Sequence, residues 1–241
     1  MPIAPSRLAP LDADEAGEPL LPAPATKGAA AKDQGTDEPV APSPRTMTKD
    51  NKFLRGTLTH ALLEHLPTLP SASWQSAAIR FIAQRGAGLS AATPASIVTE
   101  SLAVLTDPTF AAVFGPGSRA EVPLVAEIAN PAPKRGAAKS TLKVTGQIDR
   151  LVITDHDCLI IDYKTNRPPP LLADGVPQAY LLQLAAYRLA LRQIFPGKQV
   201  RAAILWTDGA RLMAISEATL TGCEHKLWTQ EAAKLDAHLE A

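Results

Sequence analysis

The sequence is poor in cysteine. Its 241 residues include two cysteines, Cys158 and Cys223, which excludes a disulfide framework and any zinc or iron–sulfur site built from four cysteines. No apolar run approaches the length of a membrane span. The N-terminus also lacks the basic region followed by an apolar one that marks a secretory signal. We therefore expect a cytosolic protein without an iron–sulfur cluster.

Aromatic residues are missing from the first fifty positions, which nevertheless hold nine of the 22 prolines. The same stretch carries five basic and eight acidic residues, so its formal charge is −3. A segment that is rich in proline and alanine, acidic and free of aromatics cannot bury enough apolar surface to fold. We predict a disordered tail or linker over residues 1–50 and one folded domain over residues 51–241.

A phosphate-binding loop of the pattern G-x-x-x-x-G-K-[ST] is also missing. These residues therefore hold no ATP site of that kind. The formal net charge of the chain is zero, which neither favours nor opposes a nucleic-acid partner, because a nuclease needs only a local basic groove.

The most informative segment lies in the middle of the chain, where Asp162 and Lys164 follow an apolar run at residues 159–161. In a strand, side chains two positions apart point to the same face, so these two project together while Tyr163 projects the other way. Asp149 precedes Asp162 by thirteen residues. Paired carboxylates can hold a hard divalent cation, and a neighbouring lysine can stabilise negative charge that develops on an attacked phosphate.

Two interpretations of this segment stand side by side. An Asp-x-Lys pair on a strand is most often part of a surface hairpin with a cross-strand salt bridge. The apolar run that precedes Asp162 instead indicates a buried central strand, and charged groups seldom end such a strand without a function. The second interpretation predicts a metal-dependent phosphodiesterase.

Helical and strand patterns alternate along the rest of the chain, which predicts an α/β fold. Apolar residues at helical spacing, and short β-branched runs bounded by turns, mark the elements. A basic loop is expected between the first two strands, over residues 131–140. The predicted helices are residues 51–66, 73–84, 93–106, 108–114, 177–195 and 220–239. The predicted strands are residues 121–128, 142–153, 158–164, 200–206 and 211–215.

This order of elements resembles the PD-(D/E)XK nucleases in their RecB-like branch, and most closely the C-terminal nuclease domain of the AddA helicase–nucleases. The resemblance runs from about Phe53 to Ser216. It implies a restriction-endonuclease-like core, in which a central mixed β-sheet is flanked by helices, with an N-terminal helical segment. The matching segments are residues 56–60, 121–123, 146–150, 161–165, 183–187 and 204–213.

The resemblance implies roles for five residues. His60, Asp149 and Asp162 match metal ligands, and the carbonyl group of Tyr163 is a further candidate ligand. Lys164 matches the catalytic lysine. Without the resemblance, a histidine on a helix is more often a buried structural residue than a metal ligand.

Further matches lie on the helix after the lysine and on the first strand. Gln183 and Tyr187 match residues that line the site near the DNA, although by spacing alone they are an ordinary pair on one helix face. Glu121 matches a recurrent glutamate of the family, and Glu127 competes for that position.

The function implied by the resemblance is that of a Mg²⁺- or Mn²⁺-dependent deoxyribonuclease of the exonuclease type. It would act on single strands or unwound ends in recombinational double-strand-break repair, in a bacterial-type cytosol. The implied partners are DNA, a helicase motor that is not in these residues, and an AddB-like subunit, with no membrane. The alternative is a catalytically inactive DNA-binding or assembly module. The sequence leaves open whether the chain is a fragment of a helicase–nuclease or a stand-alone protein.

Overall fold

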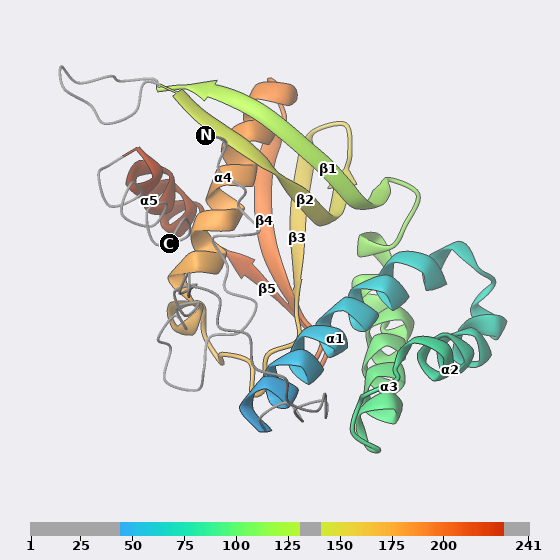
Figure 1. The fold of residues 1–241 in the computed structure, drawn as a ribbon. Coiled ribbons are helices and arrows are strands. Elements are labelled where there is room, and N and C mark those ends of the chain that lie inside the picture. Colours follow the sequence, from blue (N-terminus) through green and yellow to red (C-terminus); the bar gives the residue numbers. More distant parts are fainter. Residues whose placement is uncertain (1–43, 131–140, 229–241) are drawn as a thin grey trace, which may run out of the picture.

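Five strands form one mixed sheet with helices on both of its faces (Figure 1). The structure, a computed structural model, describes residues 44–130 and 141–228. The predicted α/β architecture with a central mixed sheet is confirmed. The strands are β1 (Ser118–Ala129), β2 (Thr141–Ile153), β3 (Asp157–Lys164), β4 (Gln199–Trp206) and β5 (Arg211–Ile215). The helices are α1 (Pro44–His65), α2 (Trp74–Arg85), α3 (Thr93–Thr106), α4 (Gln178–Ile194) and α5 (Glu217–Leu227), with short 3₁₀ turns η2 (Leu66–Thr68), η3 (Ser71–Ser73), η4 (Pro108–Val113) and η5 (Ala173–Gly175).

The strands follow one another across the sheet in chain order. Neighbouring strands are antiparallel except β3 and β4, which are parallel. Parallel neighbours need a crossover connection, and α4 supplies it between β3 and β4. The helix that carries Gln183 is therefore packed against the strand that carries Lys164.

Strand β3 is buried on both faces, as the apolar run of the sequence predicts. Cys158 and Ile160 point into the larger core, which α4 and α5 cover. Ile161 and Tyr163 point to the opposite face and pack with Leu63 of α1 and with residues of η4. The alternation thus directs every second residue of β3 toward α4 and the others toward α1, which leaves the end of the strand between the two layers.

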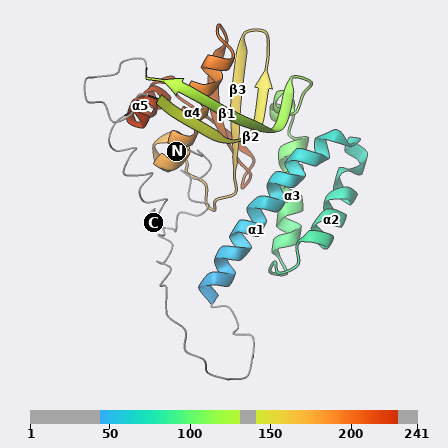
Figure 2. The same ribbon diagram turned by 45° about the horizontal axis from the view of Figure 1, so that its top comes forward.

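Helices α1, α2 and α3 form a separate layer of the molecule. Figures 1 and 2 show the three helices gathered at one side, with α2 farthest from the sheet. Their apolar cluster joins Leu58 and Leu62 of α1 to Ile82 of α2 and Ile97 of α3. None of the described helices combines the length and the apolar character needed to cross a bilayer.

Two predicted helix boundaries are wrong. Helix α1 begins at Pro44 rather than at residue 51, so residues 44–50 are helical although we assigned them to the tail; proline is well tolerated in the first turn of a helix. Helix α5 begins at Glu217 rather than at residue 220, and the Ser216 side chain caps it by accepting from a backbone N–H; its bounds are Glu217–Leu227, and residues 229–239 of the predicted helix lie outside the described residues. The remainder of the predicted tail, the predicted basic loop and residues 229–241 lie outside the described residues.

Candidate active site

The sheet opens around Asp149 on β2. The paired residues of β2 and β3 end at Arg150 and Ile161, so Asp149 is the first residue of β2 beyond the pairing. Beyond that point, Oδ2 of Asp149 accepts a hydrogen bond of 2.7 Å from the backbone N–H of Tyr163. A carboxylate thus replaces the next ladder bond, which anchors Asp149 to the backbone of the strand that carries the predicted catalytic lysine.

Glu121 lies on β1 across from Asp149, at a gap in the registered pairs between β1 and β2. Its φ of 48° is in the left-handed region, which costs a non-glycine residue roughly 1–2 kcal/mol. The side chain of Gln147 donates to the Glu121 carbonyl oxygen at 3.3 Å. Strained residues of this kind persist where their surroundings hold them, and they gather at functional sites.

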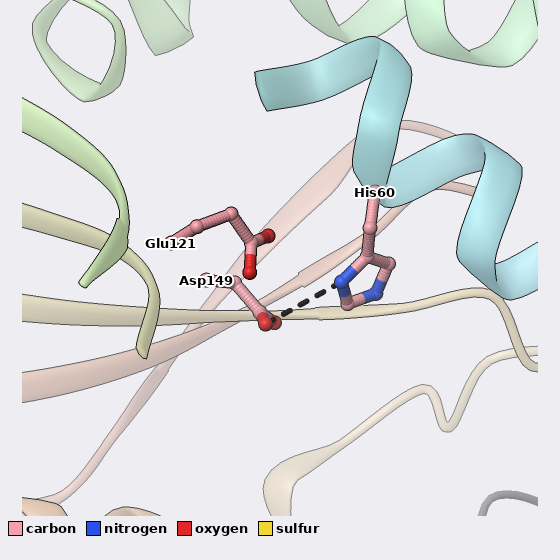
Figure 3. Close-up of side chains that lie close together, drawn as sticks. All are labelled: His60, Glu121 and Asp149. Atoms are coloured by element: carbon pink, nitrogen blue, oxygen red, sulfur yellow. Dashed lines mark ion pairs between the residues drawn. The ribbon is translucent and has the colours of Figure 1, made fainter. Parts of the chain in front are cut away.

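His60 approaches the same point from α1. Its Nδ1 lies 3.4 Å from Oδ1 of Asp149, and its Nε2 lies 3.2 Å from the carbonyl oxygen of Tyr163. His60, Glu121 and Asp149 each offer one donor atom, and these three atoms lie within 4.8 Å of one another. Figure 3 shows the three side chains converging from α1, β1 and β2. One nitrogen and two carboxylate oxygens at this spacing form a candidate metal centre.

The charges of the cluster are coupled by burial and by proximity. Burial by itself lowers the pKa of His60, but attraction to Asp149 outweighs it, so the pKa of His60 is raised. Burial by itself raises the pKa of Asp149, but His60 and then Lys164 outweigh it, so the pKa of Asp149 is lowered. Burial raises the pKa of Glu121 to about 7, and repulsion from Asp149 adds to that shift. Glu121 and Asp149 therefore repel each other, and one imidazole is the nearest positive charge to both. A bound cation would offset this repulsion.

Asp162 and Lys164 form an ion pair at the end of β3. The distance from Lys164 Nζ to Asp162 Oδ2 is 2.8 Å, which confirms that the two side chains share a face. Burial lowers the pKa of Lys164, but Asp162 and Asp149 outweigh it and raise the pKa. Burial of Asp162 raises its own pKa more than Lys164 lowers it. Lys164 is thus kept in its protonated form. The positive charge near Asp162 does not fully offset the effect of burial on its ionised form.

Tyr180 of α4 supports Lys164 from the other side. The ammonium lies 4.3 Å from the centre of the Tyr180 ring, a distance suited to cation–π attraction. No sequence motif singles out Tyr180. The available signal is its spacing of three residues before Gln183 and seven before Tyr187, which places all three side chains on one face of α4.

One cavity of about 460 Å³ joins these groups. Its walls come from α1, from the strands β1, β2 and β3, and from α4. It has the size of an ordinary ligand-binding cleft. The side chains of the predicted metal ligands, the lysine and Gln183 all line it. The full lining is Lys52, Phe53, Gly56, Thr57, His60, Ala61, Glu64, Glu121, Gln147, Asp149, Asp162, Tyr163, Lys164, Thr165, Asn166, Tyr180 and Gln183.

Tyr187 does not line this cavity. Its hydroxyl donates to the carbonyl oxygen of Gln147 at 3.0 Å, and the side-chain amide of Gln183 contacts it at 3.4 Å. A Cβ atom on Gly146 would lie 2.5 Å from the same hydroxyl oxygen, so only glycine admits the ring there. Tyr187 therefore supports the strand that carries Asp149 instead of facing the cavity.

The two competing glutamates of β1 lie in different surroundings. Glu121 belongs to the cluster with His60 and Asp149. Glu127 is exposed and lies 3.8 Å from Nζ of Lys143. The separation arises because Glu121 sits at the interruption of the strand, whereas Glu127 lies within its regular pairing.

Arg150 connects the helical layer to the catalytic strand, a role that the sequence pattern does not reveal. It is buried. Its Nε donates to the hydroxyl of Tyr163 at 2.9 Å, and its Nη2 donates to the carbonyl oxygen of Leu63 on α1. Its guanidinium also lies over the ring of Phe114, 4.8 Å from the centroid. Arg150 thereby helps to fix α1, and with it His60, relative to β3.

The family model of the PD-(D/E)XK nuclease superfamily matches residues 37–240. No curated protein matches the chain in sequence. The crystal structure of SSO0001 is similar at 17% sequence identity, over 73% of this chain and 83% of that chain, with a TM-score of 0.29, too low to bear on the fold. The family match covers most of the chain, and the mixed sheet flanked by helices agrees with it. The chain therefore belongs to the PD-(D/E)XK nuclease superfamily and has a restriction-endonuclease-like fold.

Proposed function

We propose that the protein is a metal-dependent deoxyribonuclease that hydrolyses phosphodiester bonds. The observation that carries this proposal is the meeting of the His60, Glu121 and Asp149 donor atoms within 4.8 Å of one another. The same cavity holds the Asp162–Lys164 ion pair. A cation site beside a buried ammonium can support phosphodiester hydrolysis, because both stabilise negative charge on the phosphate.

The donor set fits a hard divalent cation such as Mg²⁺ or Mn²⁺. Asp149 and His60 would hold it, with the carbonyl group of Tyr163 at 3.2 Å from the His60 ring as a further ligand. Glu121 joins this set by position. Asp162 lies outside the 4.8 Å cluster, so its role as a ligand rests on the family resemblance. A cation bound there would lower the pKa of a water ligand and neutralise charge on the phosphate.

Lys164 and the two side chains that hold it have the remaining roles in the proposed reaction. Lys164 presents its ammonium to the cavity, where it can stabilise the negative charge that grows on the phosphoryl oxygens. Asp162 and Tyr180 hold that ammonium in place. In the reaction a water oxygen bonds to phosphorus, the bond from phosphorus to the leaving oxygen breaks, and the leaving oxygen takes up a proton, without a covalent intermediate on the protein.

We also propose an exonuclease acting on single strands or unwound ends in double-strand-break repair, within an AddA-like branch. Support for this comes from the order of the sequence motifs, from Gly56 and His60 to Gln183 and Tyr187. The partners would be a helicase motor and an AddB-like subunit. The near absence of cysteine agrees with an AddA-like site and not with relatives that carry an iron–sulfur cluster.

The test is cleavage of end-labelled single-stranded DNA by the purified protein with Mg²⁺ or Mn²⁺. We expect Lys164→Ala to lower single-turnover cleavage roughly a hundredfold, the scale of losing one electrostatic stabiliser. DNA binding measured in Ca²⁺ should change little, because one lysine is a small part of a phosphate-contacting surface. Lys164→Arg should rescue poorly, since a planar fork cannot replace a compact ammonium.

Calorimetric titration with Mn²⁺ provides the accompanying measurement. Asp149→Asn should abolish most of the metal binding, while Lys164→Ala should retain it. If the wild-type protein binds DNA and Mn²⁺ but does not cleave, alone or with a helicase partner, the nuclease proposal fails and the inactive DNA-binding module takes its place.

A further inference from the structure

Phe53 is an aromatic side chain that the core does not use. All five phenylalanines lie in the described part of the chain, and Phe53 is the one that is mainly exposed, at 52%. It belongs to none of the three apolar clusters of the described residues. A single exposed apolar side chain is common on protein surfaces, so the position of Phe53 decides whether it has a role.

The position of Phe53 is not that of an ordinary surface residue. It lines the 460 Å³ cavity together with His60, Asp149 and Lys164. Phe53 and His60 are seven residues apart on α1, which is two turns, so both point from the same face of the helix. The distance along the axis is about 10 Å, or about three nucleotides of a stacked strand.

The neighbours of Phe53 on the same wall are polar. Lys52 and Thr57 also line the cavity, and the hydroxyl of Thr57 donates to the carbonyl oxygen of Phe53. An apolar ring beside an ammonium suits a ligand that has both a flat apolar face and a negative charge. A nucleotide unit has this combination.

We propose that Phe53 is the stacking platform of a nucleobase subsite on α1, about three nucleotides from the bond that is cut. The inference rests on the proposed nuclease function and deepens it. Aromatic rings stack on any base, so the subsite would bind DNA without a sequence preference. Bases in a duplex already stack on one another, so the subsite selects unpaired strands. Lys52 would meet the phosphate next to the stacked base.

The experiment combines substitutions with substrates that lack a single base. Single-stranded oligonucleotides carrying one abasic site, moved one position at a time from the cleaved bond, are cut by wild type, Phe53→Ala and Phe53→Trp. Ile79→Ala is the matched control, because Ile79 on α2 has the same 52% exposure and does not line the cavity. Melting temperatures establish that each variant is folded.

We expect Phe53→Ala to raise KM about tenfold on intact single strands, the scale of losing one base-stacking contact. Phe53→Trp should restore the wild-type KM, and Ile79→Ala should leave it unchanged. With wild type, an abasic site at one position should raise KM by a similar factor. With Phe53→Ala, that same abasic site should have no further effect.

The possible results distinguish a failure of the proposed subsite from a failure of the proposed nuclease function. In one result, the effects of Phe53→Ala and of the abasic site on KM multiply at every position of the abasic site. That result overturns the subsite and leaves the nuclease proposal standing. A loss of melting temperature in Phe53→Ala without a change in KM shows that the ring packs against the protein itself, which also overturns the subsite. Failure of wild type to cleave any DNA with Mg²⁺ or Mn²⁺ overturns both proposals.

Discussion

Lys164 owes its position to two neighbours of different chemistry. Asp162 provides charge at 2.8 Å from the ammonium. Tyr180 provides an aromatic face at 4.3 Å, and its hydroxyl donates to the side-chain oxygen of Asn166 at 3.2 Å. The carboxylate fixes one side of the ammonium and the ring fixes another, so the remaining side faces the cavity.

At the residue scale we predict that the ring of Tyr180 positions Lys164. Tyr180→Leu should lower single-turnover cleavage by about tenfold, since a desolvated cation–π contact contributes up to about 2 kcal/mol. Tyr180→Phe keeps the ring and should retain most of the rate. The readout is kcat against KM. A raised KM with an unchanged kcat would contradict the positioning role. Equal effects of Tyr180→Leu and Tyr180→Phe would contradict it as well.

Helix α4 is held to α5 by a partly buried ion cluster whose residues do not line the 460 Å³ cavity. Arg188 is 1% exposed. It lies 2.8 Å from Glu217 and 3.1 Å from Glu224, and its Nε donates to the carbonyl oxygen of Val200 on β4 at 3.2 Å. Arg192, which is exposed, contacts the same two glutamates. One arginine thus joins α4, α5 and β4.

At the element scale we predict that the two arginines differ sharply in their contribution to stability. Arg188→Ala leaves the buried Glu224 without its principal partner and should lower the free energy of unfolding by about 3–5 kcal/mol. Arg192→Ala removes a more exposed contact with the same glutamates and should cost about 1 kcal/mol or less. Urea denaturation of both variants measures the difference. Similar losses would show that α5 depends on both arginines equally.

The molecule as a whole consists of the sheet with α4 and α5, and the helical layer of α1 to α3. Glu100 of α3 helps to join these parts. Glu100 accepts a hydrogen bond from Arg55 of α1 and pairs with Arg167, just after β3, while Ser96 accepts a second bond from Arg55. The contacts hold α1 against the segment that leaves the catalytic strand, and so help to close the cavity.

At the scale of the whole molecule we predict alkaline destabilisation that depends on Tyr187. Burial raises the pKa of Tyr187 to about 12, from 10.0 in the unfolded chain. The unfolded state therefore loses this proton first. The associated stability is fully present below about pH 10 and is lost as the pH rises through about 12. A shift of this size corresponds to about 3 kcal/mol.

Tyr187→Phe tests this prediction. At pH 8 the variant should be less stable by about 1 kcal/mol, because it lacks the hydrogen bond to Gln147. Between pH 10 and 12 it should lose about 2 kcal/mol less than wild type. Urea denaturation at a series of pH values gives both quantities. Parallel losses in the two proteins would show that Tyr187 does not titrate with a raised pKa.

Local sequence patterns predict the type of each main element and the faces of the β3 side chains. The periodicity of residues 93–106 gives α3 at its observed bounds, and the alternation in β3 places Asp162 and Lys164 on one face, because local backbone geometry sets both patterns. The start of α1 was missed, because composition favoured a tail where a proline begins the helix. Local pattern therefore predicts element type better than element ends.

Which distant residues meet depends on the packing of the whole chain. Glu121 and Glu127 are equivalent in the sequence, yet one enters the cluster because the β1–β2 pairing is interrupted at that residue. Tyr180 of α4 contacts Lys164 of β3. Arg150 of β2 donates to the carbonyl oxygen of Leu63 on α1. Such contacts depend on strand register and helix packing, which arise when the whole chain buries its apolar surface. The residue types set the chemistry that this site can perform, and the packing set which of them share the cavity.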